Sequence, residues 1–270
     1  MRPNRLQISE AAERLADNAE LSDMVSIDPG GVGFTSLAFV RAAKVLAIRQ
    51  SCGLKSFPSG FAIKTEEYPL AHRLYLYSAG TELSHHAAEF LDFALSDAAQ
   101  PLIAEVGFAD RGIERQGVEL QGDRLAFSLT SPEEFSLPLM REMLTELRDA
   151  ERLSLTFRFT PGSSTLEPRS QSEAELFARL LAAGRYAGKE ILLVGLTDSV
   201  GDFNNNRSLA VRRAQSVADT LKASVGAGAI DDVLILVQSY GELTPVGCNE
   251  TGIGRDLNRR VEVWVRDHRR

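Results

Sequence analysis

The chain has few of the residues that build metal centres and covalent active sites. Its 270 residues include 2 cysteines and 4 histidines. CxxC and HExxH motifs are missing, and the adjacent His85 and His86 lack the i, i+4 spacing of a helical metal pair. GxSxG and P-loop motifs are missing as well. We therefore expect no metal, no other cofactor and no enzymatic activity.

Long apolar runs and an excess of positive charge are also lacking. No apolar run reaches about eighteen residues, so the sequence predicts no membrane-spanning helix. Lysine and arginine number 30 against 37 acidic residues, which gives a net charge of −7. Sequence-independent nucleic-acid binding relies on basic residues, so nucleic acid is an unfavoured partner. With 44% hydrophobic and 25% charged residues, the composition is that of a globular protein long enough for two domains.

One acid and one arginine occupy distinctive positions in the C-terminal half. Asp198 closes the apolar run ILLVGLT, so it is expected where a buried strand ends and the chain turns toward solvent. Arg213 follows inside a helical pattern. If the strand end and the helix face meet, a carboxylate and a guanidinium border one small cleft. Such a cleft suits the amine and carboxylate of an amino-acid head group.

The motifs TD, NRSLAVRRA, SYGE and NETGIGRDLNRRVE follow one another in this half. In that order they resemble the OmpA-like C-terminal domain, which binds peptidoglycan, over residues 153–266. The resemblance implies that Asp198 and Arg213 hold the diaminopimelate residue of the stem peptide. It implies four further residues on the ligand side, namely Thr197, Asn206, Asn258 and Arg259. The family usually has histidine before the TD pair, whereas this chain has Leu196.

Plainer interpretations stand beside these roles. Asp198 fits a turn or helix-capping acid. Arg213 fits a solvated helix arginine, as expected for Arg212, and the two cannot both face the cleft because adjacent helix positions point about 100° apart. Arg259 and Arg260 begin the last expected strand, where neighbours point to opposite faces, so at most one of them should reach the ligand.

The N-terminal part carries a second resemblance, between residues 25 and 110. DPGGVGF, YPLAHRLYLY and FLDFALSDAAQPLIAEVGF resemble the C-terminal part of periplasmic phosphate-binding proteins of ABC transporters. The resemblance implies a partial α/β domain and phosphate as a second partner. Backbone N–H groups at Gly30, Gly31 and Gly33 would bind an anion if they converge at a helix start. The alternative is a tight turn without a ligand.

Local patterns predict several elements in the first 152 residues. HRLYLYS alternates like a half-buried strand, and the apolar residues at 90–95 form a helix face typical of core packing. GVELQGDRLAFSLT suggests a hairpin that turns at Gly122 and Asp123. A helix is expected from Ser131, kinked or delayed by Pro138.

The C-terminal half alternates strands and helices, which predicts a fold of the α/β (α+β) class with a β-α-β-α-β-β mixed sheet and helices packed on it. The strands are expected in LSLTFRF, EILLVGLT, VLILVQSYG and RRVEVWVR, and the first helix should end at Gly188. The expected core consists of Phe157, Phe159, Leu180, Leu192, Val194, Leu209, Val217, Leu221, Ile235, Val237, Val261 and Val263. The domains are expected at 1–111 (phosphate-binding-like), 112–152 (joining segment) and 153–270 (OmpA-like).

Together these patterns predict a non-catalytic cell-envelope protein that binds peptidoglycan non-covalently, in the periplasm and near the outer membrane. The opening MRPNRLQISEAAERLADNAELSD lacks the segments of a signal peptide, which suggests a fragment, a processed form or a mis-started product. The alternative function is a phosphate-capturing ABC-transporter protein that the OmpA-like half localises. A third is an interaction scaffold with a degenerate wall site, which Leu196 would favour. Spacing leaves open whether Cys52 and Cys248 pair.

Overall fold

The structure, a computed structural model, describes residues 8–78, 82–130, 137–226 and 228–268. The chain divides into two compact units. One unit comprises Met1–Leu46 and Ser78–Asp110, and the other comprises Ala47–Tyr77 and Arg111–Arg270. Within the described ranges, the helices all fall short of the length or apolar character that a membrane crossing needs.

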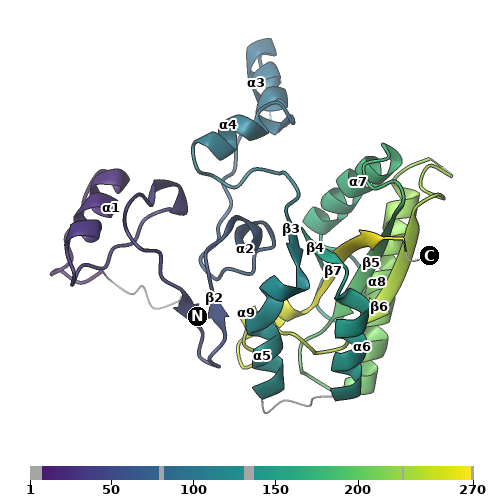
Figure 1. The fold of residues 1–270 in the computed structure, drawn as a ribbon. Helices are drawn as coiled ribbons and strands as arrows, with labels where there is room; N and C mark the ends of the chain where they lie inside the picture. The colour runs from purple at the N-terminus through teal and green to yellow at the C-terminus, as the bar shows by residue number, and fades with distance from the viewer. Residues whose placement is uncertain (1–7, 79–81, 131–136, 227, 269–270) are drawn as a thin grey trace. The chain divides into compact units, whose positions relative to one another are not determined.

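The larger unit is built on a five-stranded sheet with the order β3-β4-β7-β5-β6 (Figure 1). The strands are β3 (Arg115–Gly117), β4 (Glu151–Arg158), β5 (Lys189–Leu196), β6 (Leu234–Ser239) and β7 (Arg260–Asp267). β5 and β6 run parallel, and the other neighbouring pairs run antiparallel. The predicted class, a mixed sheet with helices packed on it, is confirmed.

Helices α7 (Pro168–Ala182) and α8 (Phe203–Ala223) pack on one face of this sheet. The alternation of LSLTFRF places Leu153 and Phe157 on that face, as predicted, and both are fully buried. Gly195 in β5 lets α8 lie close, because a Cβ atom there would collide with the backbone of Ala210. This close approach brings the middle of α8 near the end of β5.

A second core fills the other face, where α6 (Leu137–Leu147) covers the sheet. Leu192 and Val194 belong to this second cluster together with Trp264, so the single predicted core was wrong on this point. Successive residues of a strand face opposite sides, and β5 is buried on both. Pro138 stands in the first turn of α6, where its missing N–H costs no hydrogen bond. The expected start at Ser131 lies outside the described residues.

Two local predictions in this unit need correction, and one short helix was not predicted. In place of the hairpin at Gly122 and Asp123, the chain forms η2 (Val118–Gln121) and α5 (Gly122–Thr130), whose inward positions Gln121, Leu125 and Ser128 stand three to four residues apart. The helix expected to reach Gly188 ends at Ala182, and Gly184 terminates it with φ 74°. A short helix that the sequence analysis missed, α9 (Gly252–Asn258), is capped by the Thr251 side chain.

Residues 47–77 belong to the larger unit, although residues 78–110 of the smaller unit separate them in sequence from the rest of it. They form a hairpin of β1 (Ile48–Arg49) and β2 (Lys55–Ser56), followed by α2 (Gly60–Lys64). Phe61 of α2 is buried. The expected half-buried strand in HRLYLYS is wrong, since this stretch has no regular secondary structure and Tyr77 is 90% exposed.

The smaller unit is helical over its described residues. Its elements are α1 (Asn18–Ile27), η1 (Leu37–Phe39), α3 (His85–Leu95) and α4 (Gln100–Glu105). Phe39 meets Phe108 edge to face, with ring centroids 6.3 Å apart. The helix predicted around residues 90–95 is present as α3, but its apolar face is not core: Phe90 is 59% exposed and Leu95 60%.

Candidate ligand site at the end of β5

Asp198 lies two residues beyond the end of β5, where the sequence analysis placed it. The residue is 8% exposed. Its Oδ1 accepts the backbone N–H of Val200 at 3.2 Å, and its Oδ2 accepts from Arg259 Nη1. One carboxylate oxygen therefore shapes the following turn, and the other is paired with a cation.

Arg259 connects Asp198 to the end of α9. Besides Asp198, its guanidinium donates to the carboxylate of Asp256, one turn earlier. The Arg259 side chain is 18% exposed, and that of Asp256 is 64% exposed. Arg259 is thus shared between one nearly buried and one solvent-facing acid.

Arg213 projects from the middle of α8 and is fully buried. Its Nε donates to the carbonyl of Ser163 at 3.0 Å, and its Cζ lies 5.2 Å from the centroid of the Phe159 ring. Nη1 and Nη2 are buried and have no hydrogen-bond partner among the described residues. Burial, followed by the charge of Arg259, lowers the pKa of Arg213 to about 10, while Asp198 opposes them. The arginine is therefore charged at neutral pH and electrostatically coupled to both other site residues.

Arg213 differs sharply from its neighbour. Arg212 is exposed, as expected for adjacent positions on one helix. A buried guanidinium with two orphaned nitrogen atoms is costly, since each unmade hydrogen bond of a charged group forfeits about 1.5 to 3 kcal/mol. The geometry fits a bidentate acceptor such as a carboxylate.

Asn206 and Thr197 flank Asp198 at the end of β5. The Asn206 side-chain amide donates to the carbonyls of Asp198 at 3.3 Å and Val200 at 3.2 Å, so it fixes the turn between β5 and α8. The Thr197 N–H donates to the carbonyl of Gly241 at 2.8 Å. The Thr197 hydroxyl is buried and lacks a partner within the described ranges.

Asn258 is buried behind the site, where its amide holds the loop that precedes α9. It accepts the N–H groups of Val246 at 2.8 Å and Gly247 at 3.0 Å, and it donates to the side chain of Asn249 at 2.8 Å. Asn249 in turn accepts the N–H of Ser199 at 3.3 Å. The sequence analysis did not single out Asn249, although the motif NETGIGRDLNRRVE begins with this residue.

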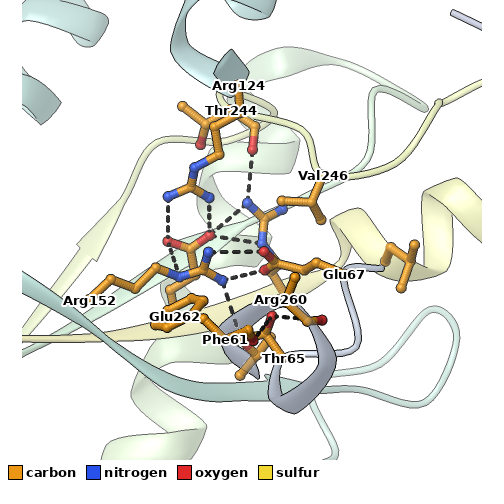
Figure 2. A network of polar contacts seen from close by, with 12 residues as sticks. Phe61, Thr65, Glu67, Arg124, Arg152, Thr244, Val246, Arg260 and Glu262 are labelled. Atoms are coloured by element: carbon orange, nitrogen blue, oxygen red, sulfur yellow. Dashed lines mark hydrogen bonds and ion pairs between the residues drawn. The ribbon is translucent and has the colours of Figure 1, made fainter. Parts of the chain in front are cut away.

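Arg259 and Arg260 diverge, but not as strand neighbours, because Arg259 caps α9 and only Arg260 stands in β7. Arg260 belongs to a separate buried network (Figure 2). There Glu262 of β7 pairs with Arg124, Arg152 and Arg260. Glu67 pairs with Arg152, so the segment 47–77 is tied to the sheet.

The charge balance of this network sets the pKa of its acids. Burial by itself raises the pKa of Glu262, but Arg124, Arg152 and Arg260 together hold it well below the ordinary value. The pKa of Glu67 is likewise lowered, because Arg152 outweighs burial. Both acids are therefore ionised at neutral pH and act as structural counter-ions.

Leu196 faces the second core and not the cluster around Asp198. It is 1% exposed and packs in the cluster that contains Val194, Tyr240 and Trp264. The position at which relatives of the OmpA-like type usually carry histidine is therefore an apolar core position in this chain.

In the smaller unit, the N–H groups of the glycine turn at residues 30–33 do not converge at a helix start, which is what an anion site there would need. It follows the C-terminal end of α1, not a helix start, and the N–H groups of Gly30 and Gly31 already bond to Asp28. Gly33 packs against α1, since a Cβ atom there would meet Leu21 and Val25.

One group of three potential metal ligands occurs within the described ranges, namely Cys52, Cys248 and Glu250. The two sulfur atoms are joined in a disulfide, which answers the question that the spacing left open. Disulfide sulfurs are not thiolate ligands, so this group holds no metal in the oxidised chain.

Comparison with known proteins matches residues 158–259 to the OmpA family. The chain is 35% identical over 115 residues to outer membrane porin F of Pseudomonas fluorescens, covering 42% of this chain and 33% of the porin. It is 33% identical over 133 residues to the outer-membrane lipoprotein YfiB of Pseudomonas aeruginosa, covering 48% of this chain and 75% of YfiB. The chain spans a third to a half of some relatives, such as 33% of the porin and 50% of outer membrane protein A of Bordetella avium.

Among solved structures, the peptidoglycan-associated lipoprotein from Burkholderia pseudomallei aligns with 22% identity and a TM-score of 0.36, over 41% of this chain and 89% of the lipoprotein. The YfiB match covers 75% of that relative at 33% identity, and the family match spans residues 158–259, which include Asp198. Through this C-terminal half, the chain belongs to the OmpA family.

Proposed function

We propose that this protein is a non-catalytic component of the bacterial cell envelope that binds peptidoglycan non-covalently. Membership of the OmpA family supports an envelope role, as do relatives whose names place them in the outer membrane. The proposed location is therefore the periplasm, in contact with the wall. Peptidoglycan is the partner that the sequence resemblance implies.

The observation that carries the proposal is the buried Arg213 guanidinium, which is coupled to Asp198 and has two nitrogen atoms without a partner among the residues that the structure describes. In the proposed complex these nitrogens donate to a ligand carboxylate, and Asp198 accepts from a ligand ammonium. A zwitterionic amino-acid head group provides both. The proposed ligand is the diaminopimelate of the stem peptide.

The ligand must displace two groups to reach this site. The first is the turn that contains Ser163, which covers Arg213 and whose Ser163 carbonyl accepts from Arg213 Nε. Arg259 occupies Asp198 in the free chain and has Asp256 as a second acceptor. We propose that the turn moves aside and that Arg259 shifts toward Asp256, so neither cation loses all its partners.

Catalysis is not proposed for this cluster. An arginine with a pKa of about 10 stays protonated at neutral pH and is a poor proton shuttle, whereas it is a good carboxylate clamp. Thr197, Asn206 and Asn258 keep the walls of the site in place, and Arg259 is the residue that exchanges with the ligand.

We place the wall-binding function in 153–270, with 112–152 joining it to the phosphate-binding-like 1–111, as expected from the sequence. The segment 47–77 adds packing to the wall-binding half. We assign no phosphate site to the N-terminal residues, because the N–H groups of Gly30 and Gly31 are already bonded.

Co-sedimentation of the full-length chain with insoluble peptidoglycan tests the proposal. At the same stem position, diaminopimelate carries a carboxylate beside its side-chain amine, and lysine carries the amine alone. The proposal predicts retention on walls with diaminopimelate and weaker retention on walls with lysine, and loss of the difference in Arg213→Ala, because lysine lacks the carboxylate that Arg213 holds in the proposed complex. Equal retention on both walls rejects diaminopimelate recognition, and retention on neither by the folded chain rejects wall binding.

A further inference from the structure

A disulfide fastens the N-terminal segment of the larger unit to the loop behind the candidate site. Cys52 stands between β1 and β2, and Cys248 stands between β6 and α9, 196 residues later, with their Cα atoms 5.7 Å apart. Cys248 is 2% exposed, and Cys52 is half-buried. The larger unit contains both residues.

Gln50 adds two hydrogen bonds at the same junction. Its Oε1 accepts the N–H of Cys248 at 3.2 Å, and its Nε2 donates to the carbonyl of Val246 at 3.4 Å. The N–H of Cys52 also donates to Cys248 Sγ at 3.2 Å. The hairpin therefore holds residues 246–248 through one covalent bond and three weaker contacts.

The other side of the same loop leads to the site. Asn258 binds the N–H groups of Val246 and Gly247, and Asn249 accepts the N–H of Ser199 at 3.3 Å. Ser199 directly follows Asp198. A continuous series of contacts thus runs from the disulfide, through residues 246–249, to the turn that positions the Asp198 carboxylate.

We propose that the Cys52–Cys248 disulfide is a redox latch for the Asp198 site, so that the oxidised chain binds peptidoglycan more tightly than the reduced chain. The inference rests on the proposed function. In the oxidised state the hairpin restrains the loop, and the loop restrains Ser199. Reduction removes the covalent restraint and leaves the weaker contacts of Gln50.

The redox step is a thiol–disulfide exchange with a dithiol reductant. One thiolate of the reductant attacks a sulfur of the disulfide and forms a mixed disulfide, and its second thiol then closes the reductant's own disulfide. Two electrons and two protons pass to the chain, which gains two thiols. Half-buried Cys52 offers the more accessible sulfur for the attack.

Contacts of residues 61–67, which follow the hairpin in the chain, confine the structural effect of reduction to the hairpin of β1 and β2. Glu67 pairs with Arg152, and Thr65 accepts from Arg158 at 2.9 Å through its carbonyl. Phe61 is buried beneath the Arg152 guanidinium, with the ring centroid 5.3 Å from Cζ. None of these contacts involves the disulfide, so reduction frees the hairpin while residues 61–67 stay attached; Figure 2 shows Glu67 and Phe61 beside Arg152.

The experiment measures binding of a soluble diaminopimelate-containing muropeptide to the full-length chain, with and without dithiothreitol. The latch predicts a dissociation constant raised about fivefold on reduction, because the competent geometry is then only partly populated. A Cys52→Ser/Cys248→Ser variant should match the reduced chain and no longer respond to dithiothreitol. Equal affinity of the oxidised and reduced chains overturns the latch.

Amide hydrogen exchange separates failure of the latch from failure of the proposed function. The N–H groups of Ser199, Gly247 and Cys248 should exchange faster after reduction, whereas β5 should not change. If the oxidised chain binds no muropeptide, the proposed function fails, and these exchange rates still decide whether the disulfide restrains the turn. Unchanged exchange at Ser199 in the fully reduced chain rejects the coupling.

Discussion

Arg259 donates to the carboxylate of Asp198 across 61 residues of sequence. The free site is therefore not an open carboxylate but a closed ion pair, and in the proposed complex the ammonium of the ligand has to replace Arg259. The second acceptor, Asp256, lies on the solvent side of the same guanidinium. This arrangement lets Arg259 leave Asp198 without becoming unpaired.

Substitution Arg259→Gln removes the cation that faces the nearly buried Asp198. We expect the free energy of unfolding to fall by about 1 to 3 kcal/mol, since a poorly hydrated carboxylate loses its counter-ion. Urea unfolding followed by circular dichroism measures the change. The exposed Arg212→Gln is the matched control and should stay within about 0.5 kcal/mol of wild type. Equal stability of Arg259→Gln and the control would contradict the pairing.

Substitution Glu262→Gln breaks the centre of the buried charge network. Three arginines then lack their shared counter-ion, and we expect a loss of about 3 to 5 kcal/mol in unfolding free energy. Glu151→Gln on β4 removes an exposed ion pair with Arg115 and should cost less than about 1 kcal/mol. Similar losses for both variants would show that the network contributes little.

The same network predicts how stability depends on pH. Glu262 and Glu67 have folded-state pKa values below their unfolded value of 4.5. Their contribution is fully present above pH 4.5, and it is lost as the pH falls through the folded values, because the unfolded chain binds protons first. Urea unfolding between neutral and acidic pH should show this decline in wild type and a shallower one in Glu262→Gln. If the unfolding free energies of wild type and Glu262→Gln decline in parallel as the pH falls, Glu262 is not the source of the pH dependence.

Substitution Leu196→His restores the residue that the family usually carries. Because Leu196 lies in the second core, an imidazole there is buried among apolar side chains, and we expect a loss of about 2 to 4 kcal/mol in stability. Binding to peptidoglycan should not improve. A stable variant with tighter binding would mean that the side chain reaches the ligand.

Regular elements of the C-terminal half were predictable because their signals are local. The alternation through Leu153 and Phe157 and the apolar run before Asp198 mark strands whatever they pack against. Buried on both faces, β5 carries no alternation, so the sequence did not reveal that Leu192 belongs to a second core. Only tertiary packing assigns the two faces.

The site was predictable only in part, for a similar reason. Motif order pointed to Asp198 and Arg213, and their electrostatic coupling agrees with that pairing. The Arg259 contact and the support from Asn249 depend on how α9 and its loop fold back. Likewise, 196 residues separate Cys52 from Cys248, and no local pattern announces contacts over that distance.

The most direct test of the account is a binding titration of the full-length chain on purified diaminopimelate-type peptidoglycan, with Arg213→Ala beside Arg212→Ala. Loss of a charge-assisted contact should weaken binding of Arg213→Ala about tenfold or more, while the exposed neighbour variant binds like wild type. Circular dichroism confirms that both variants fold. A folded Arg213→Ala variant that binds as tightly as wild type would contradict the central claim.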